Sequence, residues 1–296
     1  MATSSLLSQE FLHDLEQFRL QVRRLAAGQL QGERHSRSKG DSTDFADYRN
    51  YVAGDDLRFL DWKLYARLER LFIKLFLQEL EMPVHILLDC SSSMDTGTPS
   101  KFDFGRRLAA GLGYVALIEA DPVSVYGFGP GVVGRWGPHR GRYRLRDLLA
   151  FLSGLSAQYK GTRLNESYRQ LAQSARHRGL AFIISDFFDY GGWEDGLRHC
   201  LGHRMDVVVF HVLAPEEESP DISGEIELVD REFDVAVDLS VTPSLLRYYR
   251  ETLAGFREQI SQFVRNRGGL YVPVRSDCDF RRFIISELAA KGILKR

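Results

Sequence analysis

Stretches of consecutive apolar residues alternate along this chain with stretches whose apolar residues recur every three or four positions. The first kind predicts buried strands, as found inside parallel sheets, and covers residues 71–79, 82–89, 122–129, 132–136, 179–186, 205–213 and 270–276, with weaker pieces at 224–230 and 233–239. The second kind predicts helices at residues 101–120, 143–155, 163–178, 193–203, 243–267 and 280–292. This alternation predicts an α/β fold, with a mostly parallel sheet covered by helices on both faces.

The N-terminal part has a different pattern. Residues 9–27 carry apolar side chains at helical spacing, and Gly28 is available to end that helix. Residues 28–45 are rich in glycine, serine and charge, which predicts an irregular, basic linker. We therefore expect residues 1–80 to hold a helix, this linker and a further segment, and residues 81–296 to form the α/β domain.

Composition excludes more than it identifies. Lys and Arg total 39 and Asp and Glu total 40, so the whole molecule has no field that would attract nucleic acid or an anionic membrane. The three cysteines lack CxxC or zinc-ligand spacing, which favours reduced thiols. The first residues include acids where a signal peptide needs an apolar core, and no apolar run approaches the roughly 20 residues that span a bilayer. The sequence therefore predicts a soluble, cytoplasmic protein.

An acid and three serines follow the predicted strand at 82–89. The spacing Asp-x-Ser-x-Ser turns the carboxylate of Asp89 and the hydroxyls of Ser91 and Ser93 the same way. Hard oxygen donors with a single negative charge suit a magnesium-like ion that keeps several waters. The alternative is structural, because Asp89 or a serine can also cap the next helix or satisfy the backbone of the turn.

Two further loops carry oxygen ligands. Thr162 lies in a glycine-containing loop just before a predicted helix, and Asp186 ends the apolar strand at 179–186. Each has an ordinary structural explanation by itself, as a helix cap or a strand-end acid. Ligands of such sheets gather at the carboxyl ends of strands, so together with Asp89 these residues predict a common site.

These residues resemble a known metal site. Asp89, Ser91, Ser93, Thr162 and Asp186 match, in type and order, the metal ion-dependent adhesion site of von Willebrand factor A domains. The resemblance implies that fold, and it implies that these five residues hold Mg²⁺, or another divalent cation such as Mn²⁺ or Ca²⁺, directly or through water. A partner's carboxylate then completes the coordination shell. One departure is Phe187, which follows Asp186 where many relatives have glycine.

A second resemblance lies upstream. The segment 48–76 is similar to the core of the domain of unknown function 58 family, through Arg49, Tyr51, Gly54, Asp55, Asp56, Arg58, Asp61, Trp62, Lys63, Ala66, Arg67 and Lys74. Members of that family are often linked with MoxR-type AAA+ ATPases, which implies a protein partner of that kind or its client. From the residues alone, the alternating acids and bases predict a network of ion pairs. A second binding site is the alternative.

Two other functions are alternatives, catalysis and nucleic-acid binding. A metal-dependent phosphoesterase needs a positioned base, and no His or Glu lies beside the Asp89 loop by sequence spacing. Nucleic-acid binding through the basic and aromatic loop from Arg135 to Arg146 is the other alternative. The GxGxxG spacing at 129–134 lacks a following apolar helix and predicts a hairpin turn instead of a dinucleotide site. We expect a metal-dependent protein-interaction module with no catalytic residue, an adaptor or co-chaperone of the ATPase.

Overall fold

A computed structural model of the protein describes residues 6–21, 35–36, 45–76, 78–79, 82–160, 164–174, 179–189, 191–202, 205–229 and 236–296. The chain divides into two compact units. The larger unit comprises residues 1–26 and 82–296, and the smaller unit comprises residues 27–81. The N-terminal helix therefore belongs to the larger unit, which differs from the expected single N-terminal segment of residues 1–80.

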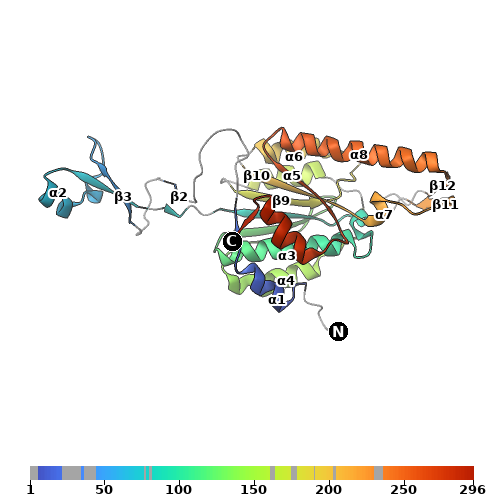
Figure 1. Ribbon diagram of the computed structural model, residues 1–296, viewed down its shortest axis with the longest axis horizontal. Coiled ribbons are helices and arrows are strands. Elements are labelled where there is room, and N and C mark those ends of the chain that lie inside the picture. Colours follow the sequence, from blue (N-terminus) through green and yellow to red (C-terminus); the bar gives the residue numbers. More distant parts are fainter. Residues whose placement is uncertain are drawn as a thin grey trace. The chain divides into compact units, whose positions relative to one another are not determined.

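A six-stranded sheet forms the centre of the larger unit (Figure 1). Its strands are β6 (Val84–Asp89), β7 (Val123–Phe128), β8 (Val132–His139), β9 (Leu180–Ser185), β10 (Asp206–Leu213) and β13 (Leu270–Arg275). They lie in the order β13-β10-β9-β6-β7-β8, all parallel except β8, which is antiparallel to β7. The predicted mostly parallel sheet is confirmed. Chain direction across the sheet reverses between β6 and β9, and this is the switch point where α/β sheets bind ligands.

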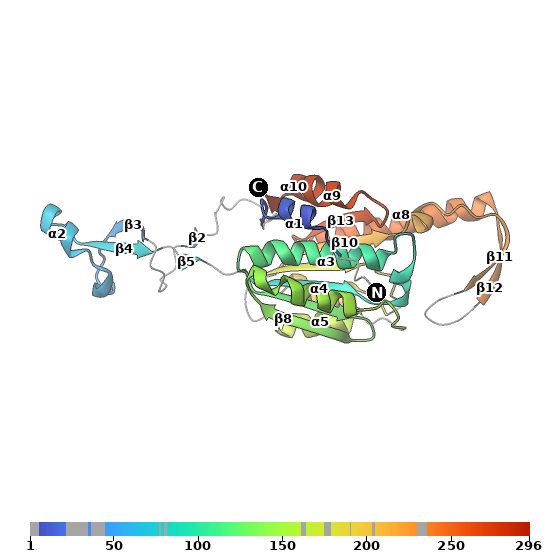
Figure 2. The same ribbon diagram turned by 90° about the horizontal axis from the view of Figure 1, so that it is seen from below.

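Helices cover both faces of this sheet (Figures 1 and 2). One face packs against α1 (Gln9–Leu15), α3 (Lys101–Ile118), α4 (Leu145–Gly154) and the C-terminal turns α9 (Phe280–Arg282), η4 (Phe283–Glu287) and α10 (Leu288–Ala290). The other face packs against α5 (Leu164–Ser174), α6 (Glu194–Gly202) and α8 (Pro243–Arg265). Side chains alternate along each strand, so neighbouring apolar residues enter different cores: Ile86 and Leu88 face the α3 side, and Leu87 faces the α5 side.

Helix α3 packs closely against the C-terminal ends of strands β6 and β9. Gly105 makes this possible, because a Cβ atom there would lie 2.8 Å from Cδ1 of Leu88 and 3.2 Å from Cγ2 of Ile184. The helix begins after Ser100, whose hydroxyl accepts a hydrogen bond from the backbone N–H of Asp103. The N-terminal end of α3 is thereby fixed beside the ends of β6 and β9.

The N-terminal helix is shorter than the expected residues 9–27. It ends at Leu15, and Arg19–Leu20 form strand β1, which pairs with β14 (Leu294–Lys295) at the other end of the chain. Leu20 is buried in the core on the α3 side, so a pairing partner from far away in sequence outweighs the local helical spacing. The rest of the predicted helix, residues 22–27, lies outside the described residues.

Between β10 and α8 the chain forms the short helix α7 (Pro215–Glu218) and an antiparallel hairpin of β11 (Gly224–Val229) and β12 (Ala236–Val241). The two weak strand predictions in this region are thus confirmed. The hairpin predicted at the glycine-rich spacing is also present, since the N–H of Gly129 donates to the carbonyl of Gly131 between β7 and β8.

In the smaller unit, β3 (Phe45–Asn50) pairs with β4 (Phe72–Phe76), and β2 (His35–Ser36) pairs with β5 (Gln78–Glu79). Between β3 and β4 lie the turn η1 (Leu57–Phe59) and the helix α2 (Trp62–Leu68). The predicted ion pairs are present within this unit: Arg49 with Asp55 at 2.6 Å, Arg58 with Asp56 at 2.7 Å, and Lys74 with Asp61 at 3.3 Å.

Candidate functional site

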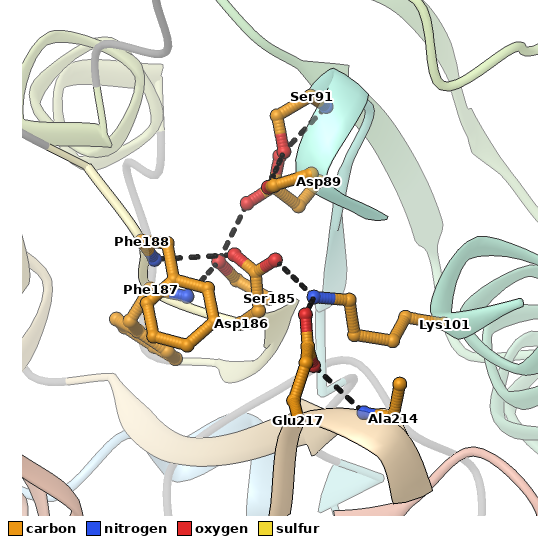
Figure 3. Close-up of polar contacts among 10 residues, drawn as sticks. Asp89, Ser91, Lys101, Ser185, Asp186, Phe187, Phe188, Ala214 and Glu217 are labelled. Carbon is orange, nitrogen blue, oxygen red and sulfur yellow. Dashed lines mark hydrogen bonds and ion pairs between the residues drawn. The ribbon is translucent and has the colours of Figure 1, made fainter. Parts of the chain in front are cut away.

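Two parallel strands end side by side at the switch point of the sheet. Strand β6 ends at Asp89, and β9 ends at Ser185, followed by Asp186. Leu88 and Ile184 are register partners, so the residues that follow them are neighbours. The hydroxyl of Ser185 donates to Oδ2 of Asp89 across 2.6 Å, as Figure 3 shows. Asp89 and Asp186, predicted from separate loops, therefore lie at one edge of the sheet.

The two serines join the same cluster. Oδ1 of Asp89 accepts a hydrogen bond of 2.9 Å from the backbone N–H of Ser91, which closes the turn after the strand. The hydroxyl oxygens of Ser91 and Ser93 are 2.9 Å apart, and a hydrogen bond from Ser93 also lowers the pKa of Asp186. Four of the five predicted site residues thus form one connected group.

The fifth residue, Thr162, lies outside the described residues. The described part of its loop approaches the site. Ser91 and Tyr159 form an isolated β-bridge, in which the N–H of Ser92 donates a hydrogen bond to the carbonyl of Tyr159. Helix α5 begins at Leu164, whose N–H is capped by the carboxylate of Asp189 at 2.8 Å. The role of Thr162 stays a prediction.

Phe187 occupies a left-handed backbone conformation, with φ of 61°. This region favours glycine, and a residue with a Cβ atom adopts it at a cost of about 1 to 2 kcal/mol. Its ring is buried and packs edge-on against Trp193 and His211. Its N–H donates to the hydroxyl of Ser185. The loop therefore places Phe187 in a conformation that favours glycine, and burial of the ring offsets the strain.

Sequence reasoning missed two charged residues beside Asp186. Lys101 is the first residue of α3, and its ammonium, which has no solvent exposure, lies 2.7 Å from Oδ2 of Asp186. The same ammonium contacts Glu217 of α7 (Figure 3). The ring of Phe188 lies 5.2 Å from it. The signal in the sequence is weak: a lysine in the first turn of a helix opposes the helix dipole and so needs a nearby acid.

The pKa values follow from burial and from these charges. Burial, reinforced by the negative charge of Asp186, raises the pKa of Asp89 to about 7. Burial also acts to raise the pKa of Asp186, but the charge and hydrogen bond of Lys101 outweigh it, and this pKa lies below its ordinary value. For Lys101, burial lowers the pKa and the two carboxylates raise it, with a net rise. Burial raises the pKa of Glu217 despite the ammonium.

The donor set fits a hard divalent cation. Among the described residues, no three His, Cys, Asp or Glu side chains lie close enough together to hold a metal ion. A cation here would therefore depend on hydroxyl oxygens too. The 2.9 Å between the oxygens of Ser91 and Ser93 suits adjacent ligands of Mg²⁺, because two oxygens about 2.1 Å from an octahedral ion lie about 3 Å apart. Asp89 would supply a carboxylate, and a cation there would keep that carboxylate ionised by offsetting the charge of Asp186.

The histidines nearest the site are poor candidates for catalysis. His211, on β10, is buried, with Nδ1 2.7 Å from the hydroxyl of Tyr271, and burial lowers its pKa to about 4. His85 is buried on β6, and burial lowers its pKa to about 4 as well. His85 is 8% exposed and His211 is 1% exposed, so neither imidazole is readily accessible from solvent.

The basic loop combines core and surface residues. Trp136 is only 8% exposed and belongs to the core on the α3 side, whereas Tyr143 is 75% exposed beneath the guanidinium of Arg144. Arg144 also pairs with Asp147 at 2.9 Å. A single exposed ring offers a small stacking surface compared with the rows of aromatic residues typical of single-strand binding.

No helix in the described part of the chain is long and apolar enough to cross a membrane.

Comparison with known proteins finds several sequences and structures to which this chain is similar. "Uncharacterized protein Rv1480" of Mycobacterium tuberculosis is 26% identical over 282 residues, which span 94% of this chain and 88% of the relative. Among solved structures, the conserved hypothetical protein BatB from Bacteroides thetaiotaomicron shares 17% identity with a TM-score of 0.43, over 71% of this chain and 98% of that chain. An aerotolerance-related membrane protein from Bacteroides fragilis shares 18% identity with a TM-score of 0.44, over 72% and 96% of the two chains. A family model described as "Protein of unknown function DUF58" matches residues 47–258, more than half of the sequence. The chain therefore belongs to the DUF58 family.

Proposed function

We propose that the cluster at the ends of β6 and β9 binds a divalent cation, Mg²⁺ in the first place, and through it an acidic residue of a protein partner. Asp89, Ser91 and Ser93 would hold the ion, with Thr162 and Asp186 contributing as the family resemblance implies. A bound cation supplies a Lewis-acidic position for a carboxylate oxygen of the partner.

The observation that carries this proposal is the arrangement at the switch point. Two buried carboxylates, both about 1% exposed, lie on neighbouring strand ends with two hydroxyls beside them. Buried acids placed so close together destabilise a fold unless a cation compensates them. Lys101 compensates Asp186, whereas the contacts of Asp89 within the described part of the chain are hydrogen bonds from uncharged groups.

The protein acts in this proposal as a recognition module rather than an enzyme, and its partner is a MoxR-type AAA+ ATPase or a client of that ATPase in the cytoplasm. That partner comes from the family resemblance. A metal-dependent phosphoesterase would need a solvent-accessible base near the cation, whereas His211, which packs against Phe187, is buried.

Isothermal titration of the full chain with Mg²⁺ and Mn²⁺ tests the first step. We expect binding by the wild type, loss of binding by Asp89→Ala, and weakening by Thr162→Ala. Asp147→Ala is the matched control, since that acid lies on α4 and is half exposed, with Arg144 as its partner. Capture of the purified ATPase, with and without chelator, tests the second step. Equal capture under both conditions would refute a metal-mediated contact.

A further inference from the structure

Four charged side chains are packed together at the candidate site. The acids are Asp89, Asp186 and Glu217, and the base is Lys101. Lys101 has no exposed surface, Asp89 and Asp186 are about 1% exposed, and the Glu217 side chain is 18% exposed. With all four groups charged, the cluster carries a net charge of −2.

Lys101 and Glu217 are each fixed from outside the strand ends. Lys101 stands at the start of α3, which packs closely on β6 through Gly105. The Oε2 atom of Glu217 accepts a 2.8 Å hydrogen bond from the N–H of Ala214, which holds the other carboxylate oxygen toward the ammonium. The two residues come from different elements and meet beside Asp186.

Asp186 is consequently occupied on both oxygens. Its Oδ2 accepts from the ammonium of Lys101, and its Oδ1 accepts from the backbone N–H of Phe188 at 3.1 Å. These contacts orient the carboxylate and cancel its charge. Both oxygens of Asp89 also accept hydrogen bonds, but from uncharged donors, the backbone N–H of Ser91 and the hydroxyl of Ser185. The difference in charge compensation therefore favours direct coordination of a cation by Asp89 and the serine hydroxyls.

We propose that Lys101 and Glu217 set the net charge of the proposed metal site, an inference that rests on the function proposed above. That net charge determines the balance between holding a cation and capturing a carboxylate. A divalent cation brings the cluster from −2 to neutral. An acidic group of a partner then approaches a site that does not repel it. Both residues act through Asp186 and the local charge, so they are positioning residues.

The proposal requires opposite effects of two substitutions that break the same ion pair. Lys101→Met leaves a cluster of −3, which holds a divalent cation more tightly but stays negative when loaded and repels a carboxylate. Glu217→Gln leaves a cluster of −1, which holds the cation more weakly and, when loaded, attracts a carboxylate more strongly. If the two residues had a purely structural role, both substitutions would change the affinity for the cation in the same direction. The reason is that each removes one partner of the Lys101–Glu217 contact.

The first experiment measures Mn²⁺ binding to the full chain at pH 8 by the electron paramagnetic resonance signal of free Mn²⁺. We expect Lys101→Met to bind about tenfold more tightly than the wild type and Glu217→Gln about tenfold more weakly, as a single buried charge near a divalent ion implies. The double variant Lys101→Met/Glu217→Gln again carries −2 and is expected to bind within about threefold of the wild type. Near-UV circular dichroism confirms that each variant is folded. If Lys101→Met fails to fold, Glu217→Gln and the double variant still test whether Mn²⁺ affinity rises as the cluster becomes more negative.

The second experiment uses difluoroacetate as the carboxylate probe. Its ¹⁹F line broadens when it exchanges onto protein-bound Mn²⁺, so the broadening at saturating Mn²⁺ reports carboxylate capture. We expect less broadening with Lys101→Met and more with Glu217→Gln than with the wild type. Mn²⁺ affinities that change in the same direction in both single variants, or not at all, would overturn the role of Lys101 and Glu217 while leaving the metal site intact. A wild type that binds no Mn²⁺ would overturn the proposed function and this inference together.

Discussion

The raised pKa of Asp89 predicts that the stability of the metal-free protein falls as the pH rises. Burial and the charge of Asp186 raise its folded-state pKa from the ordinary 3.8 to about 7. An acid with a raised folded pKa contributes stability that is fully present below 3.8 and is lost as the pH rises through 7. At 1.36 kcal/mol per pKa unit the full loss is about 4 kcal/mol. Between pH 5 and pH 8 the expected loss is about 3 kcal/mol, since part of it occurs below pH 5.

The comparison that isolates this effect is with Asp89→Asn. Asparagine retains an oxygen to accept the N–H of Ser91 but carries no charge, so its contribution does not change over this pH range. Other titrating groups, such as the buried His85 and His211, contribute equally to both proteins and cancel in the difference. In chelator, the variant should gain about 3 kcal/mol relative to the wild type between pH 5 and pH 8.

Urea unfolding followed by near-UV circular dichroism, at half-unit steps of pH in EDTA, measures this difference. Added Mg²⁺ should stabilise the wild type more at pH 8 than at pH 5, because the cation competes with the proton on Asp89. It should leave Asp89→Asn unchanged. A difference between the two proteins that is flat with pH would refute the assignment of a raised pKa, and with it the electrostatic argument for a cation.

Three further predictions test the surroundings of the site and the smaller unit. Ser185→Ala should lower stability by about 1 to 3 kcal/mol and move the pH midpoint of the stability curve upward, because its hydroxyl hydrogen bond lowers the pKa of the neighbouring carboxylate. Gly105→Ala should lower the stability of the fold by about 1 to 3 kcal/mol, since the new Cβ would lie 2.8 Å from Cδ1 of Leu88. Its control, Gly255→Ala, lies at an open helix position and should raise stability by about 0.5 to 1 kcal/mol. Thermal melts of the two variants and the wild type measure both effects. Backbone and side-chain hydrogen bonds lower the pKa of Asp61 to about 2, so the smaller unit should lose stability as the pH falls from about 4 through 2, and far-UV circular dichroism of Asp61→Asn should lack that transition.

The fold could be predicted from sequence because its signals are local. Unbroken apolar runs such as residues 180–184 fit a strand buried on both faces, and alternation with helices then predicts a parallel sheet. The helix expected over residues 9–27 failed for a nonlocal reason. Arg19 and Leu20 pair with residues at the other end of the chain, Leu20 with Leu294, and no local sequence pattern indicates such a partner.

The same distinction separates the site residues. Asp89 and Asp186 were predictable, since the end of each apolar strand is visible in the sequence and parallel strands end at one edge. Lys101 and Glu217 were not, because their contacts span 85 and 116 residues and depend on how α3 and α7 pack. The motif predicts the candidate ligands, whereas the charged residues packed around them become visible only in the folded structure.

Three departures from stabilising patterns converge on this one edge of the sheet. A carboxylate is buried with its pKa raised to about 7, Phe187 adopts a conformation that favours glycine, and Lys101 stands in the first turn of a helix where the dipole opposes it. The strands that lead into this edge are apolar and fully buried, so the cost is local and not a general feature of the fold. Departures of this kind persist where function requires them. Their concentration around Asp89 argues for a binding site independently of any family resemblance, and a cation, the ligand that we propose, would offset the largest of the three costs.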